Sequence, residues 1–329
     1  MTPAAPTRRQ ALGRLGGLAA AALAPTAPTA FAQAPYPSKP ITLVMPFPAG
    51  GSFDPIFRAL TDAAARDLGQ PIVLMPRPGA GGVTAPAGVA TMSEADGYTL
   101  TLMHNSVIRA PLVQKVAFDP LRDFTYLGNL FGLTTAVAVA ADAPWKTLAD
   151  LLADAKKRPG EISYGTVGAI SVNRIMAERL ARSVGTRFNM IPFKGGGEAW
   201  TSLIGRQLDV YGDPGFGPQA KGGKVRLLAS FTDRRLARFP DVPTVRELGH
   251  DFVIESPVGL VAPKGLDAKV VARLAAAFQK AAKDPAYLAQ LEAFDMQPQI
   301  GTPEAHAAYA RAQFEREHKL LAEIGFKPE

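Results

Sequence analysis

Short apolar runs alternate along this chain with longer stretches in which apolar residues recur every three or four positions. Short runs bounded by turn residues are typical of buried strands, and the longer spacing is typical of amphipathic helices. The runs predict strands at residues 41–45, 72–75, 99–103, 135–140, 162–165, 208–211, 225–230 and 258–262. The periodic stretches predict helices at 55–68, 82–91, 148–157, 172–183, 197–204, 267–282, 285–293 and 303–323. Alternating strands and helices predict an α/β fold, with sheets covered by helices on both faces.

The first 32 residues have the pattern of an export signal. Arg8 and Arg9 precede a modestly apolar stretch at 12–23, and residues 30–32 form an A-x-A cleavage site that leaves Gln33 as the mature start. The arginine pair favours the twin-arginine route, but the match is partial, so general secretion stays open. The chain has no cysteine, which excludes disulfides, thiolate metal sites and a lipid-anchored cysteine. We therefore expect a soluble protein of the periplasm.

Length and charge narrow the class of protein further. The 329 residues are enough for about two domains. The net charge of +7 falls to about +4 when the three arginines of the leader are removed. Basic residues are scattered among acidic ones, which disfavours nucleic-acid binding. No run of 18 apolar residues occurs, so we expect no membrane-spanning helix.

The turn at residues 46–54 is the strongest candidate for a binding site. It follows the apolar run at 41–45 and contains Gly50 and Gly51, which allow a tight turn with uncovered N–H groups. Asp54 and the proline after it resemble a helix cap followed by the first helical residue. A helix N-terminus behind a glycine-rich turn attracts anions. The sequence therefore predicts a site for a carboxylated or phosphorylated ligand here.

Four other turns are weaker candidates, because each is also explained as a structural turn or cap. They are 104–106, 164–173, 192–198 and 211–216. Small and hydroxylated residues in such turns present N–H and O–H donors. Residues 79–82 resemble a phosphate loop but lack the glycine spacing of one, so we interpret them as tight helix–sheet packing.

Catalytic motifs are absent from the sequence. There is no G-x-S-x-G elbow and no H-E-x-x-H pair. A triad of His104, Ser171 and Asp213 is conceivable, but nothing in their spacing calls for it. We expect neither a metal nor a cofactor, and we expect that the protein is not an enzyme.

Eight segments in order resemble the periplasmic solute-binding receptors of tripartite tricarboxylate transporters, the Bug family. They read YPSKPI (36–41), PFPAGGSFD (46–54), RPGAGG (77–82), DGYTL (96–100), PLRDF (120–124), IPFKG (191–195), KGGKVR (221–226) and FPDVPTV (239–245). The resemblance implies a two-domain clamshell with the type II periplasmic-binding fold, in which two hinge strands cross near 130–135 and 254–258. Domain 1 would comprise residues 33–133 and 256–329, and domain 2 residues 134–255.

The resemblance also implies a site and a function. Domain 1 would contribute Ala49, Gly50, Gly51, Ser52, Phe53 and Asp54, and domain 2 Thr166, Gly168, Ala169, Ser171, Gly195 and Asp213. To these the turn at 104–106 adds His104, Asn105 and Ser106 as candidates. The protein would capture a small carboxylated metabolite, an organic, amino or aromatic acid, and deliver it as a monomer to the membrane permease subunits of the transporter. Two alternative functions stay open. The receptor could present its ligand to a sensor kinase, or the protein could be a hydrolase with His104 as base.

The second loop departs from the family pattern at positions that affect specificity. Val167 replaces a small polar residue, Ile170 a glycine and Arg174 a histidine. With Phe53, Phe216 and Pro257, Ile170 predicts a less polar cleft. Our hypothesis from this pattern is a monocarboxylate or aromatic acid rather than a tricarboxylate.

Overall fold

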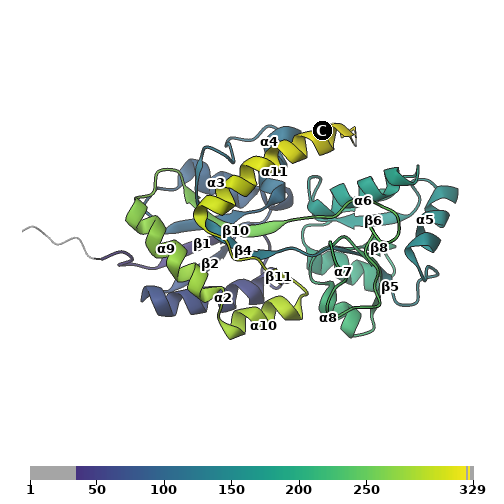
Figure 1. Ribbon diagram of the computed structural model, residues 1–329, viewed down its shortest axis with the longest axis horizontal. Helices are drawn as coiled ribbons and strands as arrows, with labels where there is room; N and C mark the ends of the chain where they lie inside the picture. The colour runs from purple at the N-terminus through teal and green to yellow at the C-terminus, as the bar shows by residue number, and fades with distance from the viewer. Residues whose placement is uncertain (1–34, 324, 327–329) are drawn as a thin grey trace, which may run out of the picture. The chain divides into compact units, whose positions relative to one another are not determined.

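The computed structural model describes residues 35–323, 325 and 326 and contains two β-sheets (Figure 1). The predicted export signal lies outside the described residues. The first sheet has the strand order β11-β4-β10-β3-β1-β2. Its strands are β1 (Ile41–Met45), β2 (Ile72–Pro76), β3 (Thr99–Met103), β4 (Phe124–Gly132), β10 (Pro257–Pro263) and β11 (Gln297–Pro298). Strands β1, β2 and β3 are parallel, and β10 runs antiparallel to both β3 and β4.

The second sheet has five strands in the order β7-β6-β8-β5-β9. They are β5 (Ala136–Ala140), β6 (Ser163–Thr166), β7 (Asn189–Pro192), β8 (Val210–Tyr211) and β9 (Val225–Ser230). Every predicted strand is present, with ends that differ by up to two residues. Strands β4, β7 and β11 were not predicted.

Helices cover both sheets, which confirms the predicted α/β class. Those beside the first sheet are α2 (Phe53–Leu68), η1 (Ala80–Gly82), α3 (Thr84–Met92), α4 (Asn105–Val113), α9 (Ala268–Ala281), α10 (Pro285–Ala293) and α11 (Pro303–Glu323). Those beside the second are α5 (Leu148–Lys157), α6 (Val172–Ser183), α7 (Gly196–Ile204) and α8 (Phe216–Lys221). The predicted loop at 104–106 is wrong in part, because Asn105 and Ser106 begin α4. Among the described residues, no helix combines the length and apolar character needed to cross a membrane.

The start of α2 differs from the prediction. The helix begins at Phe53, with Ser52 at the cap position and no side-chain capping bond. Asp54 therefore lies inside the first turn, where it pairs with Arg58 one turn later at 3.2 Å. A carboxylate in the first turn still complements the helix dipole. The predicted end is confirmed, since Gly69 adopts a left-handed φ of 74° at the C-cap.

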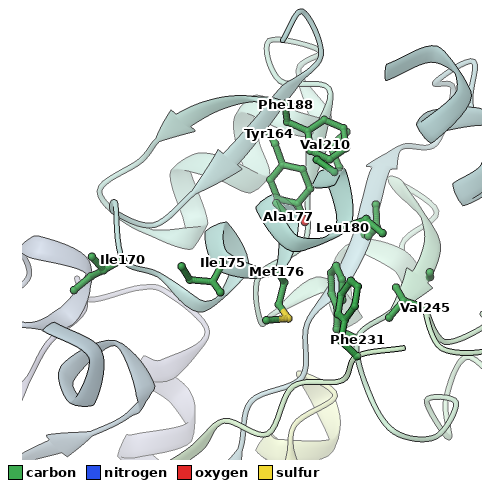
Figure 2. Packing of buried hydrophobic residues seen from close by; sticks show 14 of the residues in the cluster. Tyr164, Ile170, Ile175, Met176, Ala177, Leu180, Phe188, Val210, Phe231 and Val245 are labelled. Carbon is green, nitrogen blue, oxygen red and sulfur yellow. The ribbon is translucent and has the colours of Figure 1, made fainter. Parts of the chain in front are cut away.

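Aromatic and aliphatic side chains pack α6 against the second sheet. Figure 2 shows Tyr164 beside Phe188, with Met176 and Leu180 of α6 in the same cluster. The rings of Tyr164 and Phe188 lie 5.4 Å apart. Removal of these large side chains from water is the main force that holds α6 on the sheet. This core fixes the start of α6, and with it the loop that leads from β6 toward the candidate site.

The chain passes between the two sheets twice. It leaves the first sheet after β4 and returns to it at β10, and every strand between these two belongs to the second sheet. The passages lie side by side, because the N–H of Leu133 donates to the carbonyl of Ser256 at 2.8 Å. We retain the division into residues 33–133 with 256–329 and residues 134–255 as a proposal, which this distribution of strands supports.

Candidate functional site

A cleft of about 640 Å³ is lined by loops and helix starts that belong to both sheets. From the first sheet come residues 47–53, which connect β1 to α2. From the second come residues 194–198 at the start of α7 and residues 213–215 after β8. Clefts of a few hundred Å³ are the usual size for small-molecule sites. The arrangement therefore provides a site for a small ligand between the two sheets.

Two helix N-termini open on this cleft, those of α2 and α7. The first N–H groups of a helix have no partner within the helix, and the helix dipole makes this end positive. Neither cap residue, Ser52 or Gly195, makes a side-chain capping bond. In the first turn of α2 the N–H of Asp54 donates to the carbonyl of Gly51 at 3.1 Å, and Pro55 has no N–H. The positive ends of both helices still suit an anionic ligand such as a carboxylate.

Glycines allow the two sides of the cleft to approach closely. A Cβ at Gly195 would lie 2.8 Å from Cγ of Pro48, and one at Gly215 would lie 3.0 Å from Cβ of Ser52. Gly215 also has a φ of 97°, which disfavours any side chain there. Backbone from the second sheet thus reaches the turn after β1 with no intervening side chains.

A smaller chamber of about 40 Å³ lies against the cleft and shares part of its wall. It is large enough for ordered water, since one water needs about 10–15 Å³ measured in this way. The shared residues are Phe47, Phe53, Val167, Asp213 and Pro214. The chamber adds polar side chains from both sheets, namely His104, Ser106 and Ser171.

The structure brings together most of the residues predicted for the site. Those that line the cleft or the chamber are Ala49, Gly50, Gly51, Ser52, Phe53, His104, Ser106, Ser171, Gly195 and Asp213. Asp54, Asn105, Thr166, Gly168 and Ala169 line neither. Their assignment to a ligand stays a prediction from the resemblance.

Asn105 and Gly168 have structural contacts instead. The amide of Asn105 donates to the carbonyl of Glu255 at 2.8 Å and accepts from the hydroxyl of Tyr309 at 3.0 Å. A Cβ at Gly168 would lie 2.8 Å from Cα of Gly81. The turn at 79–82, interpreted from sequence as helix–sheet packing, therefore meets the loop after β6 of the other sheet.

Asp213 is the most perturbed acid of the cleft. The hydroxyl of Tyr211 donates to its Oδ2 at 3.1 Å. Removal from water raises the pKa of the Asp213 carboxyl to about 7, and the hydrogen bond from Tyr211 lowers it only in part. The pKa of the Tyr211 hydroxyl is raised as well, by its own burial and by the neighbouring carboxyl.

His104 is held neutral in the chamber wall. Burial lowers the pKa of its imidazole to about 4, and the backbone of Gly82 nearby opposes this only in part. Its Nε2 has no hydrogen-bond partner among the described residues. Buried polar atoms without a hydrogen-bond partner are uncommon in protein interiors, and they often mark a place where a ligand or water binds.

The same geometry does not form a hydrolytic triad. The hydroxyl of Ser171 lies 2.6 Å from Oδ1 of Asn173 and 3.0 Å from the carbonyl of Gly168, both of which accept. In the part of the chain that the structure describes, no hydrogen bond links Ser171 to His104. A serine nucleophile needs a base within hydrogen-bond reach. Ser171 instead fixes the shape of its loop.

The apolar part of the cleft differs from the sequence hypothesis. Ile170, Phe216 and Pro257 are buried in the packed interior and line neither cavity. Phe53 does line the cleft, and it stacks on Phe47 with ring centres 4.5 Å apart. The hypothesis of a less polar cleft was therefore wrong for three of its four residues.

Sequence reasoning also missed Trp200, which lies in the cleft wall. Its indole Nε1 is buried and has no hydrogen-bond partner among the described residues. Trp200 lies in the helix that was predicted at 197–204, about one turn after the three glycines at 195–197. A residue so placed faces the same space as the glycines, and this signal was available in the sequence.

The described residues contain no group of three or more His, Asp or Glu side chains that could hold a metal ion. The groups that the site offers to a ligand are backbone N–H groups, hydroxyls, aromatic rings and the Asp213 carboxyl.

Comparisons with known proteins agree on one family. Residues 56–326 match the model of the tripartite tricarboxylate transporter family receptor. The "UPF0065 protein in gbd 5'region" of Cupriavidus necator is 41% identical over 97% of this chain and 98% of its own. The solved structure of the periplasmic binding protein BugD is 28% identical with a TM-score of 0.85, and covers 89% of this chain and 100% of that one.

A further solved structure, MatC from Rhodopseudomonas palustris with bound malate, is 28% identical with a TM-score of 0.82, and covers 87% of this chain and 100% of that one. These structures share the two-domain fold predicted from the sequence. The chain belongs to the family of tripartite tricarboxylate transporter receptors, the periplasmic binding proteins that include BugD.

Proposed function

We propose that this protein is a periplasmic receptor that captures a small carboxylated metabolite in the cleft and delivers it to the membrane permease of a tripartite transporter. One observation carries the proposal. The N-termini of α2 and α7, from different sheets, open on a single cleft of about 640 Å³. A carboxylate between them accepts hydrogen bonds from both sides at once, so its binding favours the approach of the two domains.

The family and the malate in a relative's structure support a small organic acid as the ligand. The cleft adds Lys194 and Lys224, both at exposed positions. Their positive charges attract an anion without fixing its orientation, which the N–H groups do. Capture alone requires no catalytic group, and the site does not provide an activated serine. We therefore propose a binding protein and not an enzyme.

The first test is a thermal-shift and calorimetric screen of protein purified from the periplasm of an expression host. Recovery from that compartment tests export, and mass spectrometry of the N-terminus tests cleavage before Gln33. The panel contains malate, adipate, glutamate, benzoate and citrate. A ligand at 100 times its Kd stabilises the fold by about 2.7 kcal/mol, which raises Tm by a few degrees. No shift with any acid, in protein first unfolded and refolded to remove bound ligand, would contradict the proposal.

A matched pair of variants tests where the acid binds. A Cβ at Gly197, near the N-terminus of α7, would meet no atom within 4 Å, so side chains are tolerated there. Gly197→Asp places a negative charge in the cleft, whereas Gly197→Asn has nearly the same shape without charge. We expect Gly197→Asp to bind the acid at least tenfold more weakly than Gly197→Asn does. Equal affinities would show that the carboxylate lies elsewhere.

A further inference from the structure

Asp213 lies in the wall that separates the cleft from the inner chamber, and it borders both. One of its oxygens, Oδ2, accepts the hydroxyl of Tyr211 at 3.1 Å. The other, Oδ1, has no hydrogen-bond partner among the described residues. The carboxyl thus has one oxygen held by the protein and one available to whatever occupies the site.

The surroundings of Asp213 contain no cation that pairs with it among the described residues. Tyr211 and Tyr164 face it from β8 and β6, and their hydroxyls are neutral because burial raises the pKa of both. His104 faces the chamber from the other sheet and is neutral near pH 7, since burial lowers its pKa to about 4. Lys194, Glu198 and Lys224 line the outer cleft at exposed positions. An ionised Asp213 would be an unpaired anion in a site whose helix ends favour an anionic ligand.

We propose that Asp213 binds the ligand in its protonated form and donates a hydrogen bond from its carboxyl O–H to the carboxylate of the ligand. This inference rests on the proposed function. The proton comes from solvent and stays on Asp213, so no covalent bond forms or breaks in the ligand. A hydrogen bond from a neutral donor to an ionised carboxylate is short and strong, and it replaces the repulsion between two anions.

The consequence is that capture takes up a proton when the free receptor is ionised at Asp213. Burial raises the pKa of this carboxyl to about 7, so the binding-competent form predominates below neutral pH. The apparent Kd equals the intrinsic Kd divided by the fraction of competent receptor. For a carboxyl of pKa about 7, that fraction falls roughly tenfold between pH 6 and pH 8.

Asp213→Asn is the decisive variant, because an amide imitates the protonated acid. Its carbonyl oxygen can accept from Tyr211 while its N–H donates to the ligand. The probes are malate, adipate, benzoate and glutamate, each of which carries an ionised carboxylate throughout pH 6–8. We expect wild-type affinity for the acid that binds to fall roughly tenfold from pH 6 to pH 8. We expect Asp213→Asn to change less than twofold and to bind more tightly than wild type at pH 8.

Two further measurements support the test: one of proton uptake by the wild type, and one of a control variant in the same cleft. Calorimetry of the wild type at pH 8, in two buffers of different ionisation enthalpy, should show uptake of nearly one proton for each ligand bound. This result does not depend on the folding of any variant. Glu198→Gln removes a charge from the exposed part of the same cleft and should keep the wild-type pH dependence.

The outcomes separate this inference from the proposed function. If an acid binds with an affinity that does not change with pH, the receptor function stands and the role of Asp213 is wrong. If only glutamate binds, tightens as pH rises and is lost in Asp213→Asn, then Asp213 is an ionised partner of an ammonium group and the inference is overturned. If no acid binds at pH 6 or at pH 8, both proposals fall.

Discussion

Arg109 and Glu317 form an ion pair whose side chains are each only 1% exposed. Two nitrogens of the guanidinium donate to the carboxylate, Nε to Oε2 at 2.7 Å and Nη2 to Oε1 at 2.6 Å. The remaining nitrogen, Nη1, donates at 2.6 Å to the carbonyl of Ile170, in the loop after β6. A pair that joins α4 to α11 thus also holds a loop of the second sheet. That loop is the one whose Gly168 meets Gly81.

Removing one member of this pair should destabilise the protein strongly. Arg109→Met leaves the Glu317 carboxylate buried without its partner, which typically costs about 3–5 kcal/mol. Urea denaturation measures the change in the free energy of unfolding. Arg206→Met is the control, because its pair with Asp142 is largely exposed and such pairs contribute about 0–1 kcal/mol. Similar small losses in both variants would show that the buried pair is not a structural link.

The contact between Gly81 and Gly168 should be needed for ligand capture. Gly168 and Gly185 have similar φ values, 87° and 73°, but a Cβ at Gly185 would meet no atom within 4 Å. Alanine at either position costs about 1 kcal/mol in backbone strain. We expect only Gly168→Ala to weaken ligand affinity as well, because it forces the two loops apart. Calorimetry with the acid found in the screen measures this, and equal affinities in both variants would contradict it.

The stability of Asp213→Asn relative to wild type should depend on pH even without ligand. The carboxyl has a pKa of about 7 in the folded protein and about 4 in the unfolded chain. Between these values the folded state holds a proton that the unfolded state lacks, so wild-type stability falls as pH rises. The Tm of Asp213→Asn should therefore rise relative to wild type from pH 4 to pH 7, and the difference should then level off. A constant difference would mean that the pKa of Asp213 is not raised.

Intrinsic fluorescence should report occupation of the cleft. The chain has two tryptophans. Trp200 lies in the cleft wall, whereas Trp145 is buried elsewhere, with its indole N–H bonded to Asp154 at 3.0 Å. We expect ligand to change the emission of wild type and of Trp145→Phe, but not of Trp200→Phe. A signal that survives in Trp200→Phe would place the ligand-linked change outside this cleft.

The sequence predicted the strands that contain a clear apolar run, and it missed the glycine-interrupted β4 and the short strands β7 and β11. Strand β5 is buried at all five positions and was recognised from its apolar run. Strand β4 contains Gly128, Asn129 and Gly132, which break any periodic pattern. A Cβ at Gly128 would clash with the carbonyl of Gly301, so this strand needs its glycine for tertiary reasons. The residue that requires this glycine, Gly301, is far away in the sequence, so no local pattern reveals it.

The candidate site was predictable where it depends on local turn chemistry. The turn at 48–52 and Gly195 were found because glycines before a helix have a local meaning. Helix α4 was missed because it begins with Asn105 and Ser106, which are typical of turns, and contains Pro111. Which side chains face the cleft depends on how the two sheets meet. For this reason Ile170 and Phe216 were assigned to the cleft wrongly.

The position of β10 in the first sheet has a consequence for how the chain folds as it is synthesised. This strand lies between β3 and β4, yet it emerges from the ribosome only after all of the second sheet. Until then β3 exposes one unpaired edge, and β4, which pairs with β10 and the still later β11, exposes both of its edges. Unpaired edges promote pairing with other chains. The second sheet can form while its strands are being made, because they are contiguous in sequence. The first sheet closes last, and a chain truncated before residue 257 would leave β3 with one open edge and β4 without either of its neighbouring strands.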